Sequence, residues 1–324
     1  MSKYWGDKFR KILDRMSVNQ YNESITQKGR PAMLYSCQTS TLTSRGGIIY
    51  AVDTLINAGY PAIDISLFGA NGFMLEDNWR ETAAELRTIA NDRGVVFNQA
   101  HAPFGGGYDH YTQKLIPTFP RAFAFCEALG VRQMVVHPLQ QGRYYGRERE
   151  LFDMNMDFYR SLIPLADKHG VKIAIENMWQ THPVTHRICD DVCADPHELA
   201  AYYDTLNDPK HFTVCLDIGH VALCGREPQD AIRVLGHDRL GALHVHDVDY
   251  LNDLHTIPYL GRVHWDKVVE ALTDIDYKGE FTMESDAFLA PYPTDFLPVA
   301  TKYMADTTKY LAEKLQSALD EKNT

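Results

Sequence analysis

This sequence lacks long apolar runs, a dense framework of cysteines and clusters of basic residues. No stretch reaches the roughly 18 uninterrupted apolar residues of a membrane-spanning helix, so we expect no membrane partner. The six cysteines are spread over 324 residues without the regular spacing of a disulfide framework, which predicts reduced thiols. Acidic residues outnumber lysine and arginine, and the net charge is -11. Because phosphate backbones bind basic surfaces, this balance argues against nucleic acid as a general partner.

Motifs for nucleotide binding and for serine catalysis are also missing. The glycine run FGGGYD at 104–109 lacks the lysine and the following serine or threonine of a phosphate-binding loop. No serine stands in the G-x-S-x-G setting of an acyl-enzyme hydrolase. Residues 1–17 are rich in charge and lack the apolar centre of a secretory signal. We therefore expect a cytoplasmic protein that uses no nucleotide cofactor.

Eight short apolar segments recur along the chain, each bounded by glycine, proline or a polar turn. They are 31–37, 60–66, 94–103, 131–138, 170–177, 211–220, 240–247 and 279–286. Nearly continuous apolar strands are typical of a parallel sheet that is buried on both faces. Stretches with helical spacing of apolar residues lie between them, for example at 77–94, 156–170 and 265–279. Eight such strand–helix units predict an α/β fold, a single (β/α)8 TIM barrel.

The whole chain, 1–324, is expected to form one domain, because no linker or low-complexity segment divides it. Residues 1–30 are expected to add an N-terminal helical extension before the first strand. Residues 300–323 have the pattern of an amphipathic C-terminal helix, and we expect its Tyr and Met stripe to pack against the barrel.

Histidines and carboxylates stand where the predicted strands end. In a barrel of this kind the carboxyl ends of the strands form the functional face. One group, at the ends of the last four strands, consists of Glu176, Asp217, His244 and Glu284. A wider group adds His101, His137, His220, Asp253 and His255. If the strands are as predicted, both groups converge on one small mouth.

These residue types favour a divalent metal. A carboxylate at the end of an apolar run is costly to desolvate unless a cation or hydrogen bonds compensate its charge. Imidazoles mixed with carboxylates are typical ligands of Zn²⁺, Mn²⁺ or Co²⁺. We therefore predict a metal site of Glu176, Asp217, His244 and Glu284, which the wider group would enlarge to as many as three ions. The alternative is a hydrogen-bonded polar layer without metal.

The segments that carry these residues resemble the xylose isomerase-like barrels. That family includes sugar phosphate isomerases and epimerases, ketose 3-epimerases and tri-zinc abasic-site endonucleases. The matching segments are HAP at 101–103, VVHP at 135–138, IEN at 175–177, LDIGH at 216–220, HVHD at 244–247, DLH at 253–255 and MESD at 283–286. The strand expected at 60–66 departs from the pattern, with Asp64 where relatives often carry Glu.

The resemblance implies that the four-residue group holds one divalent ion and that Glu176 and Glu284 also move protons. For the endonucleases of this family, the resemblance implies a wider set of nine ligands. All nine positions carry a matching residue here. It further implies association in pairs or fours.

The expected activity is the isomerisation or epimerisation of a sugar or sugar phosphate through a metal-stabilised enediolate. Glu176 and Glu284 would act as acid and base on opposite sides of the substrate. His220 is expected to contact a substrate hydroxyl, and Trp179, Phe104 and Phe68 to wall the sugar.

Two other reactions remain open at this point. They are dehydration of a keto-inositol or polyol, and abasic-site phosphodiester hydrolysis, which the acidic surface disfavours. Arg143 or Arg147, in the segment 142–153, could meet a sugar phosphate, although interleaved glutamates favour an ordinary surface role.

Overall fold

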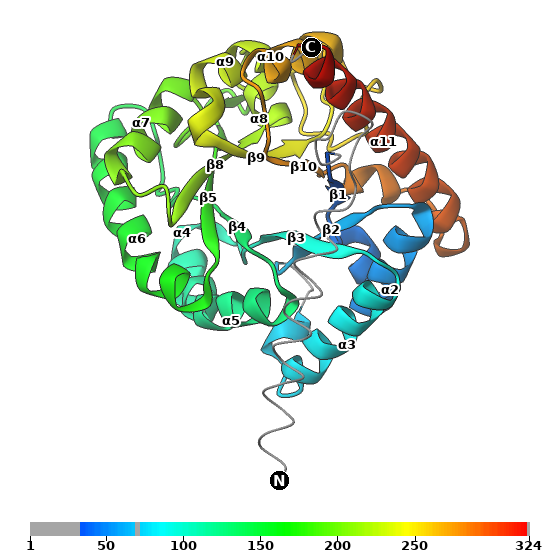
Figure 1. The fold of residues 1–324 in the computed structure, drawn as a ribbon. Coiled ribbons are helices and arrows are strands. Elements are labelled where there is room, and N and C mark those ends of the chain that lie inside the picture. The colour runs from blue at the N-terminus through cyan, green and yellow to red at the C-terminus, as the bar shows by residue number, and fades with distance from the viewer. Residues whose placement is uncertain (1–32, 69–71, 323–324) are drawn as a thin grey trace.

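Eight parallel strands form a nearly closed barrel (Figure 1) in the computed structural model, which describes residues 33–68 and 72–322. The strands are β1 (Tyr35–Cys37), β2 (Ala62–Ser66), β3 (Val96–His101), β4 (Gln133–Val136), β5 (Lys172–Glu176), β8 (Phe212–Asp217), β9 (Leu240–Val245) and β10 (Glu280–Met283). They pair in the order β1-β10-β9-β8-β5-β4-β3-β2, and one parallel bridge between Gln38 and Asp64 links the two ends. Each strand falls within one of the eight predicted segments, so the barrel prediction is confirmed.

A ring of helices surrounds the strands (Figure 1). The helices that follow the eight strands in turn are α2 (Ser40–Ala58), α3 (Trp79–Asp92), α5 (Phe119–Leu129), α6 (Glu148–His169), α7 (Pro196–Leu206), α9 (Pro228–Arg239), α10 (Trp265–Asp274) and α11 (Leu297–Lys322). Helix α10 illustrates how they pack: Trp265, Val268 and Leu272 recur at helical spacing and are all buried. The apolar stripe of each helix thus covers the outside of the sheet.

The inside of the barrel is filled by small apolar residues together with a polar layer. Val135, Ala174, Cys215 and Ala242 form a separate buried cluster there. Neighbouring strands bring these side chains to the same level, since Val135 pairs with Ala174 and Cys215 with Ala242. Interior side chains of a TIM barrel form such layers.

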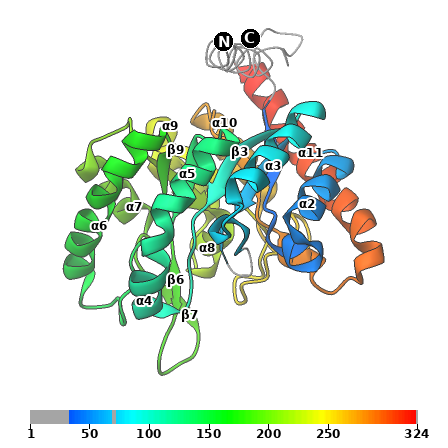
Figure 2. The ribbon, with the colours of Figure 1, turned by 90° about the horizontal axis from the view of Figure 1, so that it is seen from below.

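Three additional elements lie at the carboxyl ends of the strands. They are the short helices α4 (Gly107–His110) and α8 (Ile218–Leu223) and an antiparallel hairpin of β6 (Trp179–Thr181) and β7 (Ile188–Asp190). Figure 2 shows α4 and the hairpin at the same end of the barrel. They surround the mouth where the predicted functional residues end their strands.

The helices differ from the predictions in detail. Helix α6 begins at Glu148, eight residues before the start of the helix predicted at 156–170, so it includes half of the segment 142–153. In α11, Met304 is buried as predicted, whereas Tyr303 and Tyr310 are each 56% exposed and contact the rings of Phe288 and Tyr259. The predicted helical extension at 1–30 lies outside the described residues.

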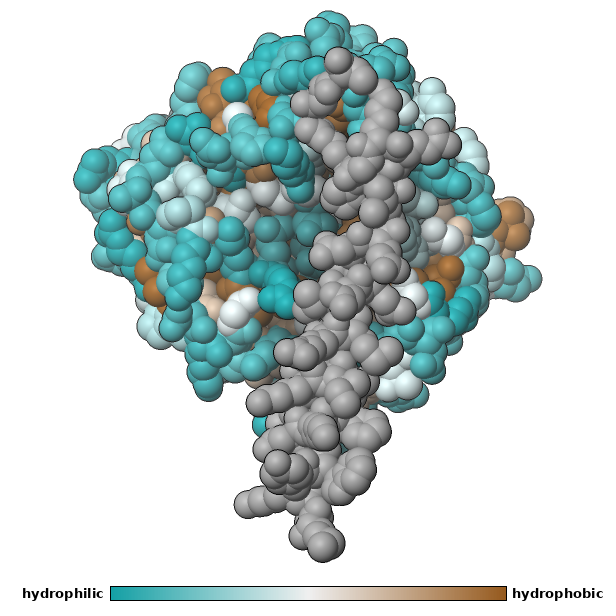
Figure 3. All heavy atoms as spheres, viewed as in Figure 1, coloured by the Kyte–Doolittle hydropathy of each residue, from teal (hydrophilic) through white to brown (hydrophobic). Residues whose placement is uncertain are grey.

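The surface seen in Figure 3 is mostly hydrophilic, with small and separate apolar patches. No helix in the described part of the chain has an apolar stretch long enough to cross a membrane.

Candidate metal centre

Four predicted ligands meet at the carboxyl ends of their strands. Glu176 ends β5 and Asp217 ends β8, while His244 is the residue before the end of β9 and Glu284 directly follows β10. Because parallel strands end at one rim, these side chains converge. Each offers one donor atom, and the four atoms all lie within 4.8 Å of one another.

His244 is at the centre of this group. Its Nδ1 atom lies 2.6 Å from Glu176 Oε1 and 2.6 Å from Glu284 Oε2. The side chains of His244 and Glu176 are 0% and 1% exposed. A single imidazole nitrogen thus faces two carboxylates in a site that excludes bulk water.

Glu176 also contacts two further predicted ligands. Its Oε2 atom lies 2.9 Å from His137 Nε2 and 3.5 Å from His101 Nε2. Donor atoms of His101, Glu176 and His244 form a second group within 4.8 Å. Glu176 therefore belongs to both groups, as a bridging carboxylate would.

A third group lies on the other side of Asp217. It consists of His220, His246, Asp253 and His255, whose donor atoms also lie within 4.8 Å of one another. His255 Nε2 is 3.1 Å from Asp253 Oδ1, and its Nδ1 atom is 2.9 Å from the Glu284 carbonyl oxygen. All nine predicted residues are thus brought into one continuous cluster.

His246 also belongs to this cluster, although it was not among the nine predicted ligands. It is fully buried, its Nε2 atom lies 3.0 Å from Asp217 Oδ1, and its ring stacks on His255 with centroids 3.9 Å apart. The backbone of α8 packs directly on this ring, since a Cβ atom at Gly219 would come within 2.0 Å of it. The alternation in HVHD was the available signal, because residues two apart on a strand point to the same face.

Backbone carbonyls fix the tautomers of three histidines. The Nδ1 atoms of His101, His220 and His255 lie 2.8 to 2.9 Å from the carbonyl oxygens of Ala102, Asn177 and Glu284. A carbonyl only accepts, so each Nδ1 carries a proton, and Nε2 is the nitrogen that faces the cluster and can offer a lone pair to a cation. Such an outer hydrogen bond is the usual companion of a metal-binding histidine.

The carboxylates are held in their charged form by the surrounding imidazoles. Burial would raise the pKa of Glu176, but His244 and His137 hold it well below its usual value. The pKa of Glu284 is likewise lowered, because His244 outweighs the effect of burial. Burial would raise the pKa of Asp217 as well, but His220 and His246 lower it below its usual value. All three carboxyl groups are therefore anionic at neutral pH.

Several buried donor atoms have no well-aligned hydrogen-bond partner among the described residues. They include Glu176 Oε2, Glu284 Oε2, His101 Nε2 and Asp253 Oδ1. Their neighbours in the cluster are close but poorly angled, which is how ligands around a common cation are arranged. Orphaned nitrogen and oxygen atoms in a buried site fit Zn²⁺, Mn²⁺ or Co²⁺.

A cavity of about 300 Å³ adjoins the cluster. Glu176, Glu284 and His220 line it, together with the rings of Phe104 and Trp179. Phe68 does not line the cavity: it packs behind Phe104, with ring centroids 4.5 Å apart. Of the three aromatic residues predicted to wall a sugar, Phe104 and Trp179 line the cavity, whereas Phe68 only supports Phe104.

Arg143 and Arg147 lie away from this cavity. Arg143 is exposed, and Arg147 donates to Glu150 and to the side chain and carbonyl oxygen of Gln141. Neither arginine lines the cavity, so the geometry favours an ordinary surface role for this segment.

Comparison with known proteins gives consistent matches. Residues 52–298 match the xylose isomerase-like TIM barrel family. The chain is 25% identical over 217 residues to D-psicose 3-epimerase of Enterocloster bolteae, a match that covers 63% of this chain and 66% of the relative.

Solved structures show the same fold. A D-tagatose 3-epimerase-like protein superposes with a TM-score of 0.71 at 17% identity, covering 90% of this chain and 100% of the other. The IOLI protein, solved with a bound zinc atom, superposes with a TM-score of 0.67 at 17% identity, covering 89% of this chain and 99% of the other. The chain belongs to the xylose isomerase-like TIM barrel family, whose matched region contains every residue of the cluster described above.

Proposed function

We propose that this chain is a divalent-metal-dependent isomerase or epimerase of a small sugar. One observation carries the proposal: Glu176 and Glu284, from strands three places apart in the barrel, face the same His244 nitrogen and line the same cavity. Two carboxylates that flank one bound substrate can remove a proton from one side and return one on the other. The similarity to proteins named psicose and tagatose 3-epimerases supports this reading.

The metal would be held by Glu176, Asp217, His244 and Glu284. When bound there, a divalent cation would polarise the substrate carbonyl and stabilise the enediolate that forms when the adjacent proton is removed. Glu176 and Glu284 are the acid and base of this scheme. His220 would donate to or accept from a substrate hydroxyl through its Nε2 atom, because its Nδ1 atom is engaged by the Asn177 carbonyl.

The cavity favours an uncharged sugar. Within the described part of the chain, no lysine or arginine lines it, while Glu176, Asp253 and Glu284 do. A phosphate group would need cationic partners to replace its hydration. Phe104 and Trp179 offer flat apolar surfaces suited to the carbon face of a sugar ring or chain. We therefore propose a free ketose, or a related polyol derivative, rather than a sugar phosphate.

The test is solvent-deuterium incorporation into a panel of unphosphorylated ketoses by metal-loaded protein. Wild type should exchange at least one substrate, and Glu176→Gln and Glu284→Gln should each slow exchange by about 10² to 10⁴. Glu280→Gln is the matched control, because Glu280 begins β10 four residues before Glu284, binds Asn98 and does not line the cavity. Absence of exchange with every ketose, at full metal occupancy, would refute the proposal.

Phosphodiester hydrolysis is the second candidate, and the third group of donors favours it. His220, His246, Asp253 and His255 could hold further ions beside the first, as a reaction that activates water and stabilises a leaving oxygen requires. We therefore propose that the site binds between one and three ions. Elemental analysis of the loaded chain measures this number, and incision of an abasic-site duplex by the same preparation would promote the second candidate over the first.

A further inference from the structure

His244 is bound differently from the other histidines of the cluster. It turns Nδ1 toward Glu176 and Glu284, whereas His101, His220 and His255 turn Nδ1 toward backbone carbonyls. Its other nitrogen, Nε2, faces the interior of the barrel at 0% exposure. There it lies 3.3 Å from Gln99 and 3.9 Å from Asp64. The Cys215 thiol, a weak acceptor, also contacts the imidazole.

Cation binding dictates which nitrogen of His244 carries the proton. A metal ligand offers a lone pair, so Nδ1 would have to give up its proton and Nε2 would have to carry one. A buried N–H without an acceptor is costly. The partner of Nε2 therefore decides whether this tautomer is stable.

Gln99 cannot be that acceptor in its observed orientation. Its Nε2 amide donates to Asp64 Oδ2 at 2.8 Å, and its Oε1 atom accepts from Gln133 Nε2 at 3.2 Å. The amide thus presents N–H groups toward His244. Asp64 is fully buried, and its Oδ1 atom has no hydrogen-bond partner among the described residues.

We propose that Asp64 is a positioning residue that accepts the Nε2 proton of His244 and so holds the imidazole in the tautomer that binds a divalent cation through Nδ1. The separation of 3.9 Å exceeds a hydrogen bond by about 1 Å, a distance that rotation of the carboxylate can close. Asp64 lies in the middle of β2, two residues before its end, so it reaches His244 from below the rim and leaves the cavity to substrate. This role rests on the metal site of the proposed function, but it does not depend on any sugar being turned over.

The experiment measures cation affinity rather than activity. The full chain is stripped with a chelator and titrated with Mn²⁺ by calorimetry and with Co²⁺ by visible absorption. Loss of an outer hydrogen bond to a metal ligand typically weakens affinity by about 10- to 100-fold. We expect about a tenfold loss in Asp64→Asn, which keeps the shape and an accepting oxygen, and up to about a 100-fold loss in Asp64→Ala. If the alanine variant does not fold, the asparagine variant carries the test.

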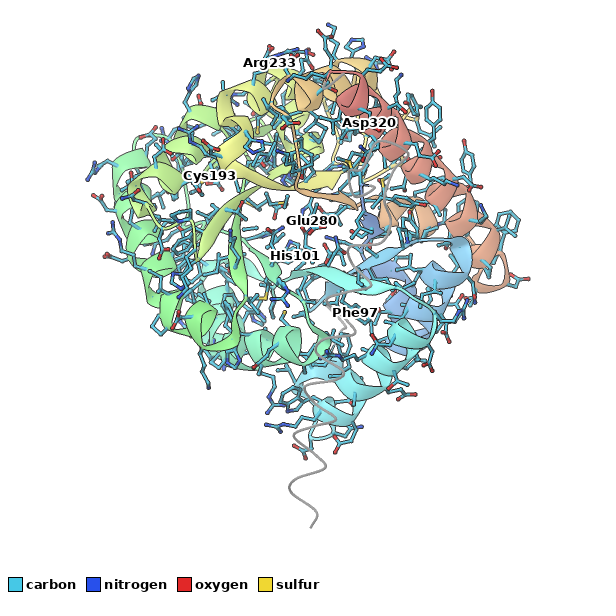
Figure 4. All side chains as sticks on the ribbon, viewed as in Figure 1. Phe97, His101, Cys193, Arg233, Glu280 and Asp320 are labelled. Carbon is cyan, nitrogen blue, oxygen red and sulfur yellow. The ribbon has the colours of Figure 1, made fainter. Side chains whose placement is uncertain are left out.

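The matched control is Glu280→Gln, which also removes a carboxylate from inside the ring of strands (Figure 4) but leaves His244 untouched. It should bind Mn²⁺ like wild type. A similar loss in Glu280→Gln would show a general effect of charge and overturn the proposal.

A double-mutant cycle separates positioning of the His244 ring by Asp64 from direct electrostatic attraction between Asp64 and the cation. In a His244→Ala background, Asp64→Asn should cause little further loss of Mn²⁺ affinity, because the residue acts through the imidazole. Equal losses in both backgrounds would overturn the proposal. So would Co²⁺ absorption bands in Asp64→Asn that match those of wild type, since the imidazole ligand should change.

The two hypotheses fail in different ways. Failure of wild type to bind either cation would remove the metal dependence of the proposed function and this role together. Tight binding by wild type and Asp64→Asn alike would remove only the role of Asp64.

Discussion

Replacement of Glu198 by glutamine should stabilise this protein above neutral pH. Glu198 lies in the first turn of α7, and its Oε2 atom accepts from the Tyr144 hydroxyl and from the Cys193 backbone N–H, each at 2.9 Å. Burial raises the pKa of its carboxyl from 4.5 to about 7, although these two hydrogen bonds oppose the shift. Folding therefore favours the protonated form of this side chain.

The sign of the pH dependence follows from this shift. Below about pH 4.5 the carboxyl is protonated in both the folded and the unfolded chain, so it contributes no difference. Between about pH 4.5 and 7 the unfolded chain has lost the proton while the folded chain retains it, so the stability of wild type falls as pH rises. Glutamine resembles the protonated carboxyl and can accept both hydrogen bonds through Oε1, so the variant escapes this loss.

The magnitude is modest but measurable. A shift from 4.5 to about 7 corresponds to about 3.5 kcal/mol at most, at about 1.4 kcal/mol per pH unit. Because part of the carboxyl remains in contact with solvent, we expect about 1–2 kcal/mol at pH 8. For a chain of 324 residues, the unfolding entropy of about 2 cal/mol/K per residue converts this to a rise of about 2–3 °C in Tm.

Thermal unfolding of wild type and Glu198→Gln at pH 5 and pH 8 provides the assay. The difference in Tm between the two proteins should be about 2–3 °C at pH 8 and about fourfold smaller at pH 5. Glu85→Gln, at an exposed position on α3, is the control for loss of one negative charge. A difference that is the same at both pH values, or a variant that is less stable than wild type at pH 8, would refute the reasoning.

Three further predictions concern the metal centre and its surroundings. Mn²⁺ or Zn²⁺ at about 100 times its Kd should stabilise the chelator-treated chain by about 2.7 kcal/mol, or about 4 °C in Tm. In a thermal shift assay, the Asp217→Asn variant should lose most of this gain. An equal gain in wild type and variant would count against the metal site. Asp247→Asn should cost about 2–4 kcal/mol in urea unfolding, because the carboxylate of Asp247 accepts from the Trp265 indole and from three backbone N–H groups, and an amide can replace only part of this set; an unfolding midpoint like that of wild type would contradict this. Phe104→Ala should raise KM for the active ketose about tenfold with a smaller effect on kcat, as expected for a wall of the cavity rather than a proton carrier; steady-state kinetics would exclude this role if kcat alone fell.

The barrel was predictable from the sequence because its strands are buried on both faces. Segments such as 170–177 are nearly continuously apolar, and in the structure Ile173, Ala174 and Ile175 are all fully buried. The ends of helices were less predictable, as the early start of α6 shows. A helix boundary depends on a few local hydrogen bonds, whereas a strand core depends on a sustained apolar pattern.

The nine predicted ligands could be named from sequence for a related physical reason. Parallel strands end at one rim, so Glu176 and Asp217 had to be neighbours once their strands were recognised. His246 and Asp64 show where this reasoning stops. His246 is a site residue because its ring reaches Asp217 and stacks on His255 across the β9–α10 loop. Asp64 matters because its carboxylate faces the inner nitrogen of His244.

The amino-acid sequence alone therefore determined which strands form the barrel and which polar residues stand at their ends, because burial on both faces and the shared direction of parallel strands are encoded in local pattern. Only the tertiary structure decided which nitrogen of each histidine faces the cluster, which carboxylate lies behind His244, and that no cation from Arg143 or Arg147 reaches the cavity. These features depend on distances of a few ångströms between residues that lie far apart in the chain, and packing of the whole barrel sets those distances.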